Sequence, residues 1–297
     1  MKSLPSSSAS KPILATSRSP RALVGRRDWV DKRTSHRGHG MWIPLAAVRH
    51  PQPKFRCKMR ALNSTEVDKW KCRVQAEDPL EADTVRTLLA RAYAESAQVE
   101  SQSSFTAAKL PDEDIRRMQK LSAGQDRLAW TNGEITFEGA MRLGELLSVG
   151  PDDVFYDLGS GYGRLTLQAH LQWGVQRSVG VELSMERHNR ALEAKGNLQP
   201  YLDTKRPVDI INANLLECDL SDATCVYMSS TCWNDVFMAQ VLGMLEQGAP
   251  ALKWAVSTEP LERKFGLKPA WLPLDRMERV PQSWAPEGYP LYIYKRV

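Results

Sequence analysis

The sequence has no run of about 18 apolar residues, the length that a helix needs to cross a bilayer, so it predicts no membrane-spanning segment. Its beginning also lacks the apolar stretch of a secretory signal. The five cysteines form no C-x-x-C pair and the five histidines are scattered, which disfavours a structural zinc site. We therefore expect no metal centre, and free thiols in a reducing compartment.

Acidic residues are nearly absent from the beginning of the chain. Residues 1–60 hold 14 lysines and arginines but only Asp28 and Asp31, a net charge of +12, whereas the remainder carries −7. A Ser- and Arg-rich, acid-poor segment is typical of a transit peptide, and residues 55–61 would suit a processing site. This composition predicts import into a chloroplast or other plastid, with the mitochondrion as an alternative. A disordered basic arm that binds nucleic acid or directs nuclear import is the other interpretation.

Three regions are expected along the chain: the tail 1–60, a helical segment 61–127, and a domain 128–297. In the helical segment, apolar residues recur with a 3.6-residue period after Pro79, and Pro111 starts a second helix with acids in its first turn. These acids would favour the dipole of that helix. A third helix is predicted over residues 136–147, at the start of the domain.

From Val154 onward, strand and helix patterns alternate, which predicts an α/β fold with a mostly parallel sheet and helices on both faces. Residues 271–284 read as irregular, and residues 291–295 alternate like a closing strand that adds an antiparallel pair to the sheet. The expected strands are 154–158, 178–182, 208–212, 225–228 and 252–256, and the expected helices are 164–173, 185–198 and 235–245.

The most informative motif joins the first strand to the first helix of this alternation. Asp157 ends an apolar run and is followed by Gly159, Gly161 and Gly163, and a second apolar run ends in Glu182. A dinucleotide site would need a third glycine where this chain has a bulky arginine, and the acid before the glycines would repel a pyrophosphate. It would attract the ammonium group of S-adenosylmethionine (AdoMet). The acid that ends the second run suits the hydroxyls of a ribose. The motif predicts an AdoMet site.

Further ligand contacts are expected at the carboxyl ends of the later strands. Asn214 could hydrogen-bond an adenine amino group while Leu215 packs on the ring, or Asn214 could be a plain turn residue. The loop 229–233 should border the same cleft.

The stretches Asp157–Ala169 and Ser178–Glu182 resemble the catalytic domain of the disruptor-of-telomeric-silencing lysine methyltransferases, which are non-SET enzymes on the class I AdoMet fold. The resemblance spans about residues 128–297 and includes 132–136, 256–260 and the end of the chain. It implies a Rossmann-like class I methyltransferase fold with a terminal antiparallel hairpin. It also implies cofactor contacts from the loop with Glu134 and Thr136, and from Ser160 in the glycine turn.

The resemblance also implies AdoMet-dependent transfer to a protein lysine, histone or non-histone. Two departures concern the acceptor side: the loop tyrosine is Asn132, and the paired asparagines are Ser229 and Ser230. Ser230 could hold the amine by a hydrogen bond. An aromatic channel would desolvate the amine and lower its pKa; its expected wall is Trp233, Trp284 and Tyr292. No nucleic-acid partner is expected for the mature domain.

Two other functions stay open: a methyltransferase for a small molecule or nucleic acid on the same fold, and a non-catalytic AdoMet-binding module. An N6-adenine or amide enzyme would normally carry a D/N-P-P-Y/F/W loop after the fourth strand, and residues 229–233 lack it. An inactive module would be expected to lose the glycines or the ribose acid, and both are present.

Overall fold

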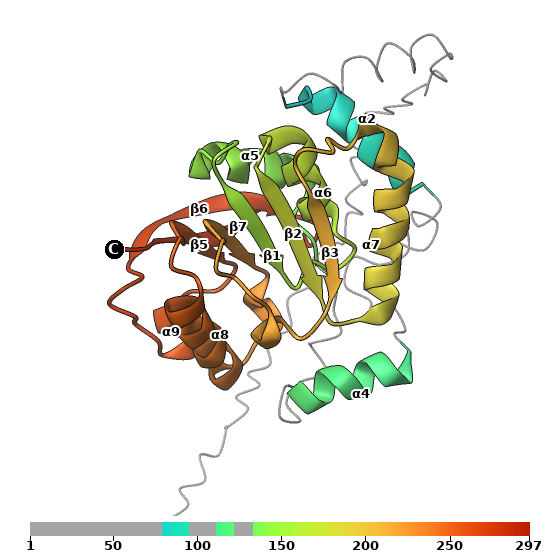
Figure 1. Ribbon diagram of the computed structural model, residues 1–297. Helices are drawn as coiled ribbons and strands as arrows, with labels where there is room; N and C mark the ends of the chain where they lie inside the picture. Colours follow the sequence, from blue (N-terminus) through green and yellow to red (C-terminus); the bar gives the residue numbers. More distant parts are fainter. Residues whose placement is uncertain (1–78, 95–110, 122–132) are drawn as a thin grey trace, which may run out of the picture. The chain divides into compact units, whose positions relative to one another are not determined.

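The computed structural model describes residues 79–94, 111–121 and 133–297, so the expectations for the basic tail and for Asn132 lie outside the described residues. In this part of the chain, a seven-stranded sheet has the strand order β3-β2-β1-β4-β5-β7-β6 (Figure 1). The pairs β3-β2, β2-β1, β1-β4 and β4-β5 are parallel, and β5-β7 and β7-β6 are antiparallel. The strands are β1 Val154–Leu158, β2 Arg177–Glu182, β3 Val208–Asn212, β4 Cys225–Met228, β5 Trp254–Ser257, β6 Leu274–Gln282 and β7 Ala285–Lys295. The order confirms the predicted Rossmann-like methyltransferase fold with its terminal hairpin.

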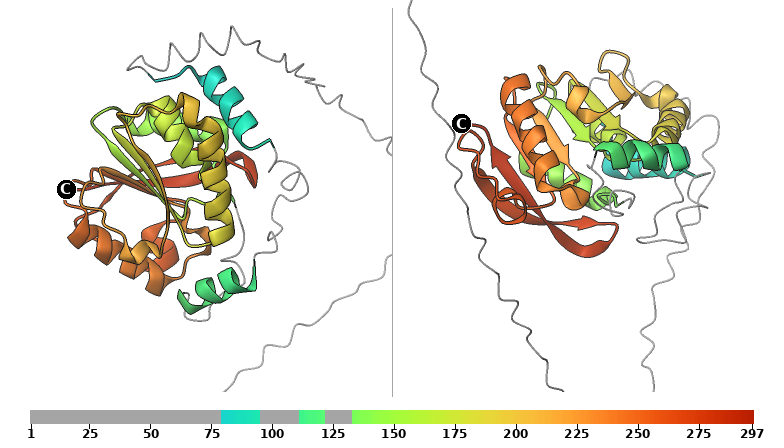
Figure 2. Two further views of the ribbon diagram at one scale, coloured as in Figure 1. Left: turned by 45° about the vertical axis from the view of Figure 1, so that its right-hand side comes forward. Right: turned by 90° about the horizontal axis from the view of Figure 1, so that it is seen from below.

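Helices cover both faces of the sheet because its parallel strands are apolar on both sides. Figure 2 shows α8 (Asp235–Gly248) and α9 (Leu261–Phe265) on one face. Tyr156 and Leu158 of β1 pack into the core on that side, whereas Phe155 packs into the core with α5 (Phe137–Leu147) and α6 (Arg164–Gln168) on the other. Also present are α7 (Met185–Leu198), the π-helical turn η2 (Ala169–Trp173) and the 3₁₀ turns η3 (Gln199–Tyr201), η4 (Leu215–Glu217) and η5 (Ser230–Cys232).

The parallel register brings the strand ends that carry the motifs to one edge of the sheet. Leu158 is paired with Met228, and Glu182 with Asn212. The glycine turn after β1, the acid that ends β2 and the loop after β4 are therefore close neighbours, as expected for a ligand site in this fold.

One stretch of the expected secondary structure was wrong. Residues 271–284 were expected to be irregular, but β6 occupies 274–282 and pairs with β7 through two register shifts. Pro281 lies at the second shift, and β6 is the edge strand, a position where proline is tolerated. The predicted helix 164–173 also changes form, because α6 ends at Gln168 and continues as the π-helical turn η2.

The two helices that precede the domain contact α7. Buried side chains of α2 (Ala82–Ala92) share a core cluster with Leu198 of α7. In α4 (Asp112–Leu121), Asp114 is buried and accepts hydrogen bonds from the Ser184 hydroxyl (2.7 Å) and from the Met185 and Glu186 amides (3.1 and 3.2 Å). This carboxylate, expected to favour the dipole of its own helix, therefore caps the first turn of α7.

Two helical glycines give a matched test of this packing. A Cβ at Gly139 in α5 would overlap with the carbonyl oxygen of Pro281, whereas a Cβ at Gly243 in α8 would have no described atom within 4 Å. We expect Gly139→Ala to destabilise the protein by about 1–3 kcal/mol and Gly243→Ala to stabilise it by about 0.5–1 kcal/mol. Urea denaturation of both variants measures the difference; equal free energies of unfolding would contradict the close approach of α5 to β6.

Candidate functional site

The glycine turn is held open in a conformation that only glycine adopts readily. Gly159, Gly161 and Gly163 have φ angles of 85°, 56° and 76°, a region that L side chains rarely occupy. The turn is fixed to the neighbouring strand because the amides of Gly159 and Ser160 both donate to the carbonyl of Val181, at 2.9 and 3.0 Å. A Cβ at Gly159 would have no described atom within 4 Å, so the turn presents backbone and open space at this position.

Glu182 is the acid that ends β2, and its side chain is buried against this turn. Its carboxylate accepts hydrogen bonds from the amides of Gly161 and Ser184, each at 2.8 Å. Burial raises the pKa of Glu182, although these two amides and Arg187 act in the opposite direction. A carboxylate oxygen has lone pairs beyond one hydrogen bond, so Glu182 can also accept from a ribose hydroxyl placed beside the turn.

Asp157, in β1, is buried and lines a cavity next to the glycine turn. The Thr166 hydroxyl donates to its carboxylate at 3.2 Å. Burial raises the pKa of Asp157 to about 8, and the charges of Glu134 and Glu182 act in the same direction. A buried carboxylate in this state favours a cationic partner. The ammonium group of AdoMet fits that requirement.

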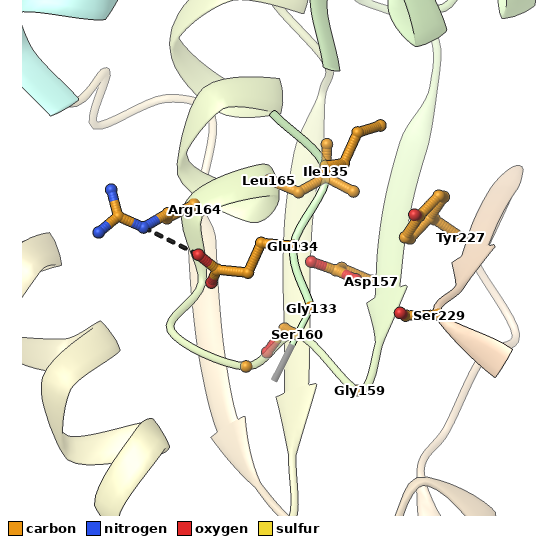
Figure 3. A pocket seen from close by; sticks show the side chains of 11 residues that line it. Gly133, Glu134, Ile135, Asp157, Gly159, Ser160, Arg164, Leu165, Tyr227 and Ser229 are labelled. Carbon is orange, nitrogen blue, oxygen red and sulfur yellow. Dashed lines mark ion pairs between the residues drawn. The ribbon is translucent and has the colours of Figure 1, made fainter. Parts of the chain in front are cut away.

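Figure 3 shows the cavity beside Asp157 from close by. Of the residues predicted to bind cofactor, Glu134, Asp157, Gly159, Ser160 and Gly161 line it. The other lining residues are Gly133, Ile135, Arg164, Leu165, Tyr227 and Ser229.

The loop that carries Glu134 forms one wall of the cavity and is paired to the terminal hairpin. The Ser283 amide donates to the Glu134 carbonyl at 2.8 Å, the Glu134 amide donates to the Ser283 hydroxyl at 3.1 Å, and Ile135 forms a β-bridge with Gln282. The Glu134 carboxylate pairs with Arg164 at 3.0 Å (Figure 3). The guanidinium of Arg164 in turn lies 3.9 Å from the centre of the Tyr93 ring. The wall is thus held by the terminal hairpin through Ser283 and Gln282, and by Tyr93 at the end of α2 through Arg164.

Five residues predicted to bind cofactor do not line this cavity: Glu182, whose contacts with the glycine turn are given above, and four others that have contacts elsewhere. The Thr136 hydroxyl caps α5 by accepting from the Gly139 amide at 3.0 Å. A Cβ on Gly163 would contact Ala191 of α7. Asn214 accepts from the Leu216 amide at 3.1 Å, which fits the turn-residue interpretation, and Leu215 is buried in the core on the α8 side.

Ser230 was expected to hydrogen-bond the methyl-accepting amine, but in the structure its neighbour Ser229 is the serine at the cavity. Ser230 is fully buried, and its hydroxyl hydrogen-bonds those of Ser257 (2.7 Å) and Thr258 (3.3 Å). Ser229 lines the cavity instead. The hydroxyl that a methyl-accepting substrate could reach is therefore that of Ser229. The chain turns into η5 directly after β4, so Ser230 points into the protein.

The three aromatic residues predicted to form one wall of a lysine channel lie in different surroundings. Trp284 lies against the cavity loop, since a Cβ on Gly133 would overlap with its ring. Tyr292 lies in β7 as the register partner of Ser257, and Trp233 packs edge-to-face on Phe237 with 5.1 Å between ring centres. Trp233 borders a separate hollow with Asn234 and Lys264. Among the three, Trp284 is the one that the structure places against the site.

Within the described ranges, no group of three or more potential ligand side chains could hold a metal ion. No helix in the same ranges is long and apolar enough to span a membrane.

Comparison with known proteins adds sequence evidence to this geometry. Residues 114–204, which include the glycine turn, Asp157 and Glu182, match the model of the family described as "Histone methylation protein DOT1". The segment that carries the glycine turn is therefore similar to that family. A protein-lysine N-methyltransferase of Saccharolobus islandicus is 39% identical over 87 residues, 29% of this chain and 52% of that protein.

A histone-lysine N-methyltransferase of Caenorhabditis elegans, specific for H3 lysine 79, is 26% identical over 120 residues, 37% of this chain and 13% of that protein. The chain thus spans about half of the archaeal relative and a small part of the nematode one. An RNA methyltransferase of Salinibacter ruber, solved with S-adenosylhomocysteine, is 25% identical and aligns with 53% of this chain and 89% of its own, with a TM-score of 0.40.

Proposed function

We propose that this chain is an AdoMet-dependent protein-lysine N-methyltransferase. The observation that carries the proposal is the pair of buried carboxylates, Asp157 and Glu182, held on either side of a glycine turn within a DOT1-type segment. Asp157 suits the ammonium of AdoMet, and Glu182 suits its ribose. When bound, AdoMet supplies a methyl group on a sulfonium, which leaves as a neutral thioether.

The chain's own residues then have to keep the substrate's lysine amine uncharged and aligned with the methyl carbon. Exclusion of water by the cavity loop and Trp284 would lower the pKa of a lysine amine. The Ser229 hydroxyl can accept an N–H of that amine and direct its lone pair at the methyl carbon, which is the orientation that in-line displacement needs. The lysine-methyltransferase names of the two curated relatives support this choice of acceptor.

The experiment that tests the proposal is transfer from methyl-labelled AdoMet by the full chain. Core histones and an extract of plastid proteins serve as acceptors, and acid hydrolysates are analysed for methylated amino acids. We expect label in ε-N-methyllysine that is absent with Asp157→Asn. Label confined to RNA or small molecules, with none on lysine, would overturn the choice of acceptor.

The two neighbouring serines allow a sharper test of the acceptor side. We expect Ser229→Ala to lower turnover about tenfold, the loss of one hydrogen bond, with unchanged affinity for S-adenosylhomocysteine. Ser230→Ala should instead lower the free energy of unfolding by about 1–2 kcal/mol, since it removes a buried hydrogen bond. Kinetics and urea denaturation of both variants separate the two roles; a turnover defect in Ser230→Ala alone would reverse the assignment.

We further propose that residues 1–60 direct the chain to a plastid, on the basis of their Ser- and Arg-rich, acid-poor composition. A fluorescent fusion of residues 1–65 expressed in leaf cells should enter chloroplasts. Nuclear signal would support the basic-arm interpretation and favour a histone acceptor over an organellar protein.

A further inference from the structure

Tyr227 lies beside Asp157 in the sheet and lines the same cavity. The two residues are register partners in the parallel pair β1-β4, so their side chains lie on the same face of the sheet. Both line the cavity, as Figure 3 shows. Tyr227 is 3% exposed, and burial raises the pKa of its phenol, with the Asp157 charge acting in the same direction. The hydroxyl is therefore a neutral group throughout the physiological range.

Gln282 completes a small polar cluster with this hydroxyl. Its amide is near enough to hydrogen-bond Tyr227 and so opposes the rise of the tyrosine pKa. Gln282 is fully buried at the end of β6, where it forms the β-bridge with Ile135 of the cavity wall. Among the described residues, neither the Tyr227 hydroxyl nor either polar atom of the Gln282 amide has a well-formed hydrogen bond.

The Tyr227 hydroxyl and the two polar atoms of the Gln282 amide indicate that a ligand supplies hydrogen bonds here. A buried polar group without a partner costs about 1–3 kcal/mol, and native proteins keep few of them. A hydrogen bond between the two side chains would satisfy one donor and one acceptor. Whichever way that bond runs, one donor and one acceptor of this pair of side chains remain without a partner, and of the two residues Tyr227 lines the cavity.

The Tyr227 hydroxyl and Asp157, which both line the cavity, fit a zwitterion better than an amine. When Gln282 donates to the tyrosine oxygen, the Tyr227 hydroxyl can donate to a carboxylate, and an ammonium group pairs with Asp157. A lysine amine ready to react offers N–H groups and one lone pair, and a donor aimed at that lone pair would block the attack. The α-amino-acid end of AdoMet carries both required groups on one carbon.

We infer that Tyr227 and Gln282 bind the amino-acid end of the cofactor next to Asp157. The inference rests on the proposed AdoMet-dependent function, and it assigns binding roles to two residues outside the glycine turn. Tyr227 would touch the carboxylate directly, and Gln282 would orient the tyrosine hydroxyl from behind.

Two ligands that differ in this end alone provide the test. S-adenosylhomocysteine contains the amino-acid end, and 5′-methylthioadenosine lacks it but keeps the adenosine. Calorimetric titration of the full chain should show that Tyr227→Phe and Gln282→Leu each bind S-adenosylhomocysteine at least tenfold more weakly and bind 5′-methylthioadenosine as the wild type does. Because both changes remove unsatisfied polar atoms, the melting temperature without ligand should stay equal or rise.

Two control variants complete the design. Tyr156→Phe alters a tyrosine on the opposite face of β1, whose hydroxyl donates to Asp222 at 2.8 Å, and should change neither affinity. Glu182→Ala should weaken both ligands alike, because both contain the ribose.

Equal losses for the two ligands, or no loss for either, in Tyr227→Phe and Gln282→Leu would overturn the inference. So would unchanged affinity for S-adenosylhomocysteine together with a higher KM for the protein acceptor, which would place Tyr227 at the amine. A wild-type chain that binds neither ligand would instead refute the proposed function, and the inference with it.

Discussion

Asp157→Asn should make the ligand-free protein more stable while abolishing its affinity for AdoMet. Burial raises the pKa of this carboxyl from 3.8 to about 8. The folded protein therefore disfavours the ionised form that the unfolded chain adopts above pH 4. The stability conferred by the protonated form is complete below about pH 4 and is lost as the pH rises toward 8, because only the unfolded state releases its proton freely.

At pH 8 we expect Asp157→Asn to raise the free energy of unfolding by several kcal/mol. Each unit of pKa difference between the folded and unfolded states corresponds to about 1.4 kcal/mol. Thermal melts from pH 4 to 9 should show the wild-type melting temperature falling more steeply than that of Asp157→Asn. AdoMet binding near pH 7 should release close to one proton in the wild type, as the ligand ammonium draws Asp157 into its ionised form. Parallel pH profiles for the two proteins would contradict the buried, high-pKa assignment.

Glu182→Ala should weaken AdoMet and S-adenosylhomocysteine about 10- to 100-fold, which corresponds to the loss of charge-assisted hydrogen bonds of about 1.5–3 kcal/mol. The change removes the acceptor for the ribose and also leaves the amides of Gly161 and Ser184 without this partner. The glycine turn would therefore lose both a ligand contact and part of its support.

Glu182→Gln separates these two contributions. The amide keeps the shape of the side chain and one acceptor oxygen but lacks the charge and the second acceptor. Its affinity should lie between those of the wild type and Glu182→Ala in calorimetric titration. Wild-type affinity in both variants would show that this acid does not contact the ribose.

The part of the site that lies close along the chain could be predicted from the sequence. Strand, glycine turn and acid are local signals, and the absence of a Cβ is what permits the positive φ angles of Gly159, Gly161 and Gly163. The parallel sheet could also be predicted, because alternation of strands and helices leaves few other topologies.

Contacts between distant segments could not be predicted in the same way. Tyr227 looks like an ordinary apolar strand residue until the register places it beside Asp157. Asp114 has the sequence signature of a helix start, and only its contact with Ser184 shows that it caps α7. The exchange between Ser229 and Ser230 depends on where β4 ends, and strand ends are among the least certain features of a sequence.

The central claim is that this cavity is an AdoMet site, and a crystal structure of the chain with S-adenosylhomocysteine tests it most directly. The account predicts the ribose hydroxyls at the Glu182 carboxylate and the ligand ammonium at Asp157. The ligand carboxylate should lie within hydrogen-bonding distance of the Tyr227 hydroxyl. Ligand bound outside the glycine turn, or with its adenine rather than its amino-acid end beside Asp157, would contradict the account.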